Sequence, residues 1–226
     1  MFDAIAGKYD LLNRVLSAGV DRRWRRHAIR SLRLTGCERV LDLCTGTADL
    51  AIAARTAGPG AARVIGVDFS TAMLGVARTK LRRRQLTDAV ALVRGDATHS
   101  PLRDQSVDAV TVAFGIRNVQ DTAAACTEIR RVLVPGGRIA ILEFAIPTTL
   151  CVRTVYLWYF NRVLPRVGRL VSRHNAAYRY LPASVGAFAP PEAFVELLRR
   201  SGFTDVAAEP LTFGIVFLYT GRRAED

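Results

Sequence analysis

Hydrophobic and polar positions along this chain follow two alternating periods that predict an α/β fold. Short apolar runs end in turns, and after each turn apolar residues recur every three or four positions, which is typical of strands alternating with helices. The predicted strands cover residues 40–43, 64–68, 90–93, 107–114 and 138–144. The fourth run is apolar almost throughout, which favours a parallel sheet covered on both faces. We therefore expect a doubly wound sheet.

The two ends of the chain depart from this alternation. The pattern of residues 1–34 predicts two helices, over 9–16 and 21–33, which precede the first strand of the sheet. Residues 147–188 form an apolar, aromatic and basic insertion without period-two alternation, so we expect it to be mainly helical. A helix over 191–201 and strands over 203–208 and 213–219 close the chain. Its 226 residues are long enough for one sizeable core, and we predict a single domain.

A glycine turn follows the first predicted strand. Gly46 turns the chain from strand into helix, at the corner where open α/β sheets bind nucleotide cofactors. A dinucleotide site would need a second glycine at the position of Ala48. Asp42 and Asp49 flank the turn and would repel a diphosphate, whereas they suit a cation. The turn therefore favours S-adenosylmethionine, which carries a sulfonium and an ammonium, over a nicotinamide dinucleotide; an ordinary turn with a solvated helix cap is the alternative.

Two further strand ends carry acids in the places that such a cofactor requires. Asp68 follows the turn by about 20 residues, the spacing at which a carboxylate meets ribose hydroxyls. Ser70 then predicts a helix N-cap. At the third strand end, Asp96 can accept from an adenine amine, and the backbone of Ala97 offers a donor to the ring. Acids at three strand ends make a more specific signal than any one of them.

These motifs resemble those of class I S-adenosylmethionine-dependent methyltransferases. Within that class the chain resembles the ubiquinone/menaquinone biosynthesis C-methyltransferases at nearly every segment. The stretches that carry this likeness are 1–3 with Tyr9, Asp10 and Asn13, then 24–26, 114–118, 131–137, 142–144, 178–182 and 211–216. The run Phe114-Gly115-Ile116-Arg117-Asn118 is the most family-specific. The resemblance implies a class I methyltransferase Rossmann-like sheet with an antiparallel last strand, N-terminal covering helices and a helical insertion before the last helix.

The resemblance also implies the residues that hold S-adenosylmethionine. These are Asp42, Thr45, Gly46, Thr47, Asp68, Phe69, Asp96, Ala97 and Ala113. The chain departs from the family at Ala48, at Ala113, where the family often has serine, and at residues 98–102, which lack the usual acid and phenylalanine. The departure at Ala113 removes one hydroxyl from the expected cofactor site.

The implied acceptor is the ring of a prenylated quinol, either demethylmenaquinol or the corresponding ubiquinone precursor. A phenolic hydroxyl has a pKa near ~10, so the protein must favour the phenolate to activate the ring carbon. We predict that Arg117 stabilises that oxygen and that Asn118 orients the ring oxygens. The alternative for Arg117 is a structural ion pair with Asp49 or Asp121. The candidates for the general base are His174, Tyr178, Glu143, Asp49 or a bound water, and the cleft candidates on the first helix are Tyr9 and Asn13.

The charge balance adds a candidate partner. A net charge of +12 favours polyanions. The basic amphipathic helix over 21–33 and the cluster at 80–84 are expected either to be solvated or to contact lipid headgroups. A nucleic-acid methyltransferase fits the charge, but the fourth strand lacks the Asn/Asp-Pro-Pro-aromatic cluster that holds a flipped base. We therefore expect the protein to bind an anionic membrane surface and no nucleic acid. A homodimer contact is the alternative role of the insertion at 147–188.

The remaining composition indicates the compartment. The four cysteines form no Cys-x-x-Cys pair, and no histidine lies at zinc spacing, so we expect reduced, mostly buried thiols and no metal. No apolar run approaches the ~18 to 20 residues of a spanning helix, and the first residues lack a signal-peptide pattern. The prediction is a cytoplasmic protein, peripheral at the inner face of the cell membrane.

Overall fold

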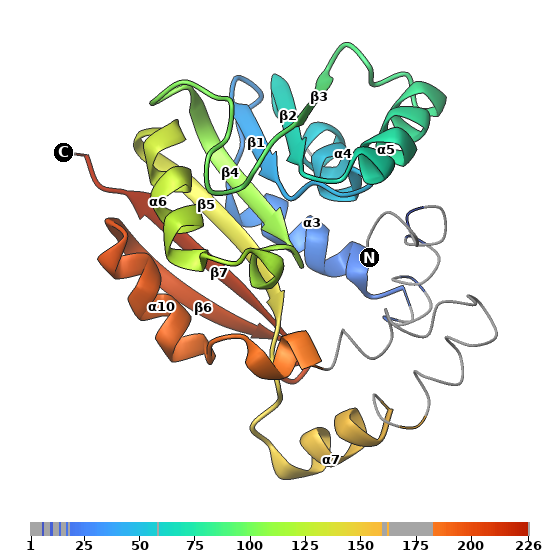
Figure 1. Cartoon of the computed structure of the whole chain (residues 1–226), viewed down its shortest axis with the longest axis vertical. Coiled ribbons are helices and arrows are strands. Elements are labelled where there is room, and N and C mark those ends of the chain that lie inside the picture. Colours follow the sequence, from blue (N-terminus) through green and yellow to red (C-terminus); the bar gives the residue numbers. More distant parts are fainter. Residues whose placement is uncertain are drawn as a thin grey trace.

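A seven-stranded sheet forms the centre of the computed structural model (Figure 1). The structure describes residues 6, 10, 14, 17, 19–57, 59–159, 162 and 183–225. The strands are β1 (Arg39–Leu43), β2 (Arg63–Asp68), β3 (Val90–Arg94), β4 (Val107–Ala113), β5 (Leu133–Phe144), β6 (Phe203–Leu211) and β7 (Val216–Arg223). They lie in the order β3-β2-β1-β4-β5-β7-β6. The first five are parallel, and β7 is antiparallel to β5 and β6, which confirms the predicted fold class.

Helices cover both faces of the sheet. The helices among the described residues are α3 (Asp21–Ser31), α4 (Asp49–Thr56), α5 (Thr71–Arg83), η2 (Ile116–Asn118), α6 (Thr122–Val132), α7 (Leu150–Trp158) and α10 (Pro191–Arg200), and α7 lies beyond the end of the sheet (Figure 1). Buried side chains of α3, α4 and α5 pack on one face of the sheet, and those of α6 and α10 pack on the other. In β1, Val40 belongs to the first core and Leu41 to the second, as the period of two along a strand requires.

Capping side chains begin two of the helices where the sequence predicts them. The Ser70 hydroxyl accepts from the backbone N–H of Met73 at 3.1 Å and starts α5. The Asp121 carboxylate accepts from the N–H of Ala124 at 2.8 Å and starts α6. Such caps satisfy a backbone donor that the helix leaves unpaired.

Two predicted strand starts are wrong, and β6 and β7 run to Leu211 and Arg223, beyond the ends predicted at 208 and 219. β5 begins at Leu133 rather than at 138, and its pairing with β4 shifts register between Val107 and Ala109, so residues 135–137 lie within an irregular strand. β7 begins at Val216 rather than at 213, because Thr212, Phe213 and Gly214 have φ angles of 48°, 58° and 83°. A left-handed backbone cannot continue an extended strand, so these residues form a turn.

The expected helical cover and insertion are described only in part. α3 is amphipathic as predicted, with Trp24, Ala28 and Ile29 buried and its arginines at 22, 23, 26 and 30 exposed. Most of the predicted helix 9–16 and of the insertion beyond Tyr159 lies outside the described residues. No described helix is long and apolar enough to cross a bilayer. The four cysteines are free thiols, but Cys37 and Cys151 are exposed, so the prediction that the thiols are mostly buried is wrong.

Candidate active site at the strand ends

A cavity of about 580 Å³ opens where the parallel strands β1 to β4 end. Residues from all four strand ends line it, as the crevice of an open α/β sheet requires. The predicted cofactor residues that line it are Gly46, Asp68, Phe69, Asp96, Ala97 and Ala113, and the predicted acceptor residue Asn118 lines it as well. Asp42, Thr45 and Thr47 line an adjoining pocket of about 30 Å³, which shares Cys44, Gly46 and Ala113 with the larger cavity.

The turn after β1 has an unusual backbone. Cys44, Gly46 and Ala48 have φ angles of 55°, 56° and 66°, which bends the chain sharply into α4. The N–H of Thr45 donates to the carbonyl of Val67 at 2.9 Å and ties the turn to β2. A Cβ at Gly115, after β4, would overlap the Cys44 side chain, so a glycine is required there for the two strand ends to approach.

Asp68 joins the turn to the next helix. Its Oδ2 accepts from the Gly46 N–H at 2.7 Å, and its Oδ1 accepts from the Ser70 N–H at 2.8 Å. In a dinucleotide fold, backbone N–H groups of this turn face a pyrophosphate. Here the Asp68 carboxylate accepts the hydrogen bond from the Gly46 N–H, which agrees with the expectation that the site does not bind phosphate.

Asp42 supports the turn from beneath the cavity. It is buried, and its carboxylate accepts from Thr45 Oγ1 at 2.5 Å, from Thr111 Oγ1 at 2.7 Å and from the Ala51 N–H at 3.1 Å. Burial raises the pKa of Asp42 to about 6, because desolvation outweighs these hydrogen bonds. Asp42 therefore holds the turn in shape rather than lining the larger cavity.

A lysine neutralises the other acid of the turn. Lys80 Nζ lies 2.6 Å from Asp49 and 2.5 Å from Asp10, and it donates to Thr47 Oγ1 at 3.1 Å. Thr47 in turn donates to Asp10 at 2.5 Å. Burial alone would raise the pKa of Asp49, but the charge of Lys80 lowers it overall. The idea that Asp49 presents a free charge to a cationic ligand is therefore wrong, because Lys80 from α5 already balances it.

The loop after β3 forms the opposite end of the cavity. Asp96 Oδ1 accepts from the N–H and from the hydroxyl of Thr98, both at 2.8 Å, and these bonds lower the pKa of Asp96. Asp96 and Ala97 both line the cavity, as the sequence predicts. A carboxylate held in its ionised form at this position is a ready acceptor for an amine.

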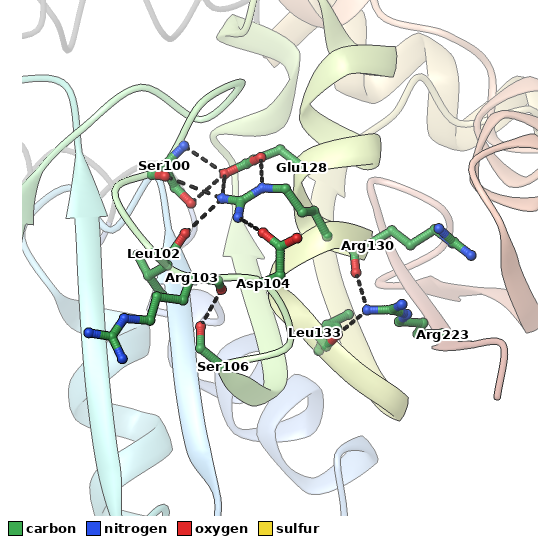
Figure 2. A network of polar contacts seen from close by, with 10 residues as sticks. Ser100, Leu102, Arg103, Asp104, Ser106, Glu128, Arg130, Leu133 and Arg223 are labelled. Atoms are coloured by element: carbon green, nitrogen blue, oxygen red, sulfur yellow. Dashed lines mark hydrogen bonds and ion pairs between the residues drawn. The ribbon is translucent and has the colours of Figure 1, made fainter. Parts of the chain in front are cut away.

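A polar network fastens this loop to α6 (Figure 2). Glu128 accepts from the N–H and the hydroxyl of Ser100 at 2.7 and 2.6 Å. Arg131 donates to Glu128 at 2.6 Å and to the carbonyl of Leu102 at 2.9 Å, and it also pairs with Asp104. Glu128 is buried, so it stays ionised only because these donors compensate its desolvation. The network sets the path of residues 96–102.

Arg117 lies in η2, after β4, and its guanidinium forms a buried ion pair. Its Nη1 lies 2.6 Å from Glu143 Oε1 and donates to the Phe114 carbonyl at 2.7 Å. The two side chains are 6% and 0% exposed, and the guanidinium lies 5.5 Å from the centre of the Phe144 ring. Arg117 does not line the cavity of about 580 Å³. The alternative partners Asp49 and Asp121 are wrong; the partner is Glu143.

The candidates for a base have different surroundings. Glu143 is fully buried against Arg117, and Asp49 is paired with Lys80, so neither carboxylate is free to take a proton. His174, Tyr178, Tyr9 and Asn13 lie outside the described residues.

Sequence reasoning missed several groups at the site. Cys44, Met73, Phe114 and Val119 line the cavity, and Lys80 holds the turn. Burial and the nearby carboxylates raise the pKa of the Cys44 thiol, so it stays protonated and is no nucleophile. The signal for Cys44 and Phe114 was their position beside strand ends, whereas Lys80 lies within α5 and its contact with the turn depends on how that helix packs.

Comparisons with known proteins agree with this geometry. The model of the ubiE/COQ5 methyltransferase family matches residues 1–223. The demethylmenaquinone methyltransferase of Thermus thermophilus is 47% identical over 99% of this chain and 100% of its own length. The ubiquinone/menaquinone biosynthesis C-methyltransferase UbiE of Geobacter sulfurreducens is 44% identical over 99% and 87%. A methyltransferase structure from Aquifex aeolicus shares the fold, with a TM-score of 0.62 and 16% identity over 88% of each chain. The chain therefore belongs to the ubiE/COQ5 methyltransferase family.

Proposed function

We propose that this protein transfers a methyl group from S-adenosylmethionine to a ring carbon of a prenylated quinol in respiratory quinone biosynthesis. The acceptor is demethylmenaquinol or the corresponding ubiquinone precursor. The observation that carries the proposal is the cavity at the strand ends, in a chain that matches demethylmenaquinone and ubiquinone/menaquinone methyltransferases over 99% of its length.

The residues around the cavity fit S-adenosylmethionine better than a phosphate-bearing cofactor. Asp68 would accept from the ribose hydroxyls, and Asp96 from the adenine amine. Gly46 donates its N–H to Asp68, so a carboxylate occupies the position at which a phosphate would accept from the turn. Asp42 shapes the turn from below. When bound there, the donor supplies an electrophilic methyl group on a sulfonium.

The acceptor ring would lie against the segment that follows β4. Phe114, Gly115 and Asn118 line the cavity there, and the Asn118 amide would orient a ring oxygen. Arg117 and Glu143 hold this segment through the Phe114 carbonyl and the Arg117 N–H. Holding two reactants in register can lower a barrier by roughly 7 to 11 kcal/mol. The ring carbon gains the methyl group and then loses its proton to a base or to water.

The substrate also suggests where the protein works. A prenylated quinol resides in a lipid bilayer, and exposed arginines on α3 suit anionic headgroups. We therefore propose a cytoplasmic protein that binds peripherally to the inner face of the cell membrane.

The test is methyl transfer by the purified full chain. Demethylmenaquinol in detergent and S-adenosylmethionine with a labelled methyl group should yield label in the extracted quinone, one methyl heavier than the substrate. Fully methylated menaquinol serves as the control acceptor and should remain unlabelled. Label in added RNA or DNA, with none in the quinone, would contradict the proposal.

A further inference from the structure

Three large apolar side chains face solvent in the two segments that lie beyond one end of the sheet. Phe213, in the turn between β6 and β7, is 80% exposed; Leu150, at the start of α7, is 76% exposed; and Ile146, after β5, is 40% exposed. The N–H of Ala145 donates to the carbonyl of Ile215 at 3.0 Å, so the segment after β5 and the turn lie side by side. We call Ile146, Leu150 and Phe213 the apolar tip.

The backbone holds Phe213 outward. Thr212, Phe213 and Gly214 all have positive φ angles, which β-branched and aromatic residues rarely adopt. The turn is nevertheless well anchored, since Gly214 donates its N–H to Leu211 at 3.1 Å and Trp24 donates to Thr212 Oγ1 at 2.8 Å. An unfavourable conformation that is fixed on several sides and exposes a phenylalanine points to a use for that side chain.

Cationic side chains lie on the helix that is bonded to the turn of the apolar tip. Trp24, whose indole donates to Thr212, follows the exposed Arg23 on α3, and the exposed Arg22 and Arg26 lie two residues to either side of it. Glu209, an acid near the end of β6, lies 2.9 Å from His27 Nε2. A cluster of apolar side chains beside arginines is complementary to an anionic lipid interface, where rings enter the headgroup region and guanidinium groups meet phosphates.

The apolar tip lies at the same edge of the sheet as the cavity. Phe144 at the end of β5 pairs with Val216 at the start of β7, and Val216 pairs with Leu211 at the end of β6. The turn therefore sits at the carboxyl end of the parallel strands (Figure 1). The cavity opens at this end of the sheet. A surface that docks here brings the cavity close to the bilayer.

We propose that the apolar tip inserts into the interface of an anionic bilayer while Arg22, Arg23 and Arg26 bind its headgroups, so that a membrane-resident quinol can enter the neighbouring cavity. The inference rests on the proposed function for the nature of the acceptor. It goes further by naming the surface that meets the lipid. The exposed Arg82 and Arg83 belong to α5, which packs on β2 and β3, far from β6 and β7 in the strand order, so they have no part in this contact.

The test is co-sedimentation of the full chain with phosphatidylcholine vesicles, with and without phosphatidylglycerol. The chain should bind the anionic vesicles, and Phe213→Ser should weaken its partitioning by about tenfold. The double substitution Arg22→Glu and Arg26→Glu should weaken it at least as much. The matched control, Arg82→Glu with Arg83→Glu on α5, should bind like the unaltered protein.

Methyl transfer in detergent and the oligomeric state of the chain separate the possible outcomes. Phe213→Ser should leave methyl transfer to a short-tailed quinol in detergent unchanged, which shows that it folds and that only docking is lost. If the unaltered protein binds vesicles through the apolar tip but methylates no quinol, the proposed function fails and the docking surface stands. Unchanged vesicle binding by Phe213→Ser would overturn the inference. So would a dimer of the unaltered chain that this substitution dissociates, because the apolar tip would then be a protein contact.

Discussion

The buried ion pair between Arg117 and Glu143 makes a quantitative prediction. Glu143 Oε1 accepts from Arg117 Nη1 at 2.6 Å and from the Phe144 N–H at 2.9 Å, and the carboxylate has no exposed surface. Glu143→Gln keeps the shape and one acceptor but removes the negative charge, which leaves the guanidinium uncompensated. Breaking a buried pair in this way costs about 3 to 5 kcal/mol. Since one hydrogen bond can persist, we expect a loss near 3 kcal/mol in the free energy of unfolding.

Urea titration of the full chain would measure that loss. The exposed pair Arg200–Glu196, at 77% and 50% exposure, supplies the control, and Glu196→Gln should cost less than about 1 kcal/mol. The double variant Arg117→Gln with Glu143→Gln should be more stable than the sum of the single losses predicts, because it buries no lone charge. If Glu143→Gln costs no more than the exposed control, the pair is not the desolvated contact described above.

The same pair decides the role of Arg117 in catalysis. Arg117→Lys keeps a cation but loses the bonds to the Phe114 carbonyl and Ser184. If the residue positions the acceptor segment, turnover should fall while the dissociation constant of S-adenosylmethionine stays close to that of the unaltered protein. An equal loss of both would make Arg117 a general structural residue.

Three further substitutions test individual parts of the site. Asp68→Asn leaves one of its two backbone donors unpaired and should weaken S-adenosylmethionine binding by about 10- to 150-fold in calorimetry, whereas the exposed Asp205→Asn should have no effect. The folded pKa of Asp42 is about 6 against an ordinary 3.8, so the contribution of Asp42 to stability should be largest below about pH 4 and fall by roughly 3 kcal/mol towards pH 6; the difference in unfolding free energy between the unaltered protein and Asp42→Asn should fall by that amount in urea titrations across this range. Glu128→Gln should loosen the loop after β3 and raise the dissociation constant of S-adenosylmethionine several-fold; an unchanged constant would mean that the loop does not need this anchor.

Local pattern was enough to predict most of the fold and the acids that line the cavity. Strand ends follow from apolar runs, and side chains at parallel strand ends must converge, so Asp68 and Asp96 could be placed from sequence alone. The turn at 212–214 could not, because an apolar stretch resembles a strand until its φ angles are known.

Partners across the fold could not be predicted. Glu143 reaches Arg117 from the next strand, and Lys80 reaches Asp49 from another helix. No spacing rule connects such residues, since their contact depends on how whole elements pack. The sequence therefore identified charged residues near the site correctly but not which of those charges were neutralised.

The central claim is that the cavity at the ends of β1 to β4 holds the methyl donor. A crystal structure of the full chain with S-adenosylhomocysteine tests it most directly. We predict density for this compound in the cavity of about 580 Å³, with its ribose against Asp68 and its adenine against Asp96 and Ala97. Density elsewhere, or a compound in the cavity that neither carboxylate contacts, would contradict the account.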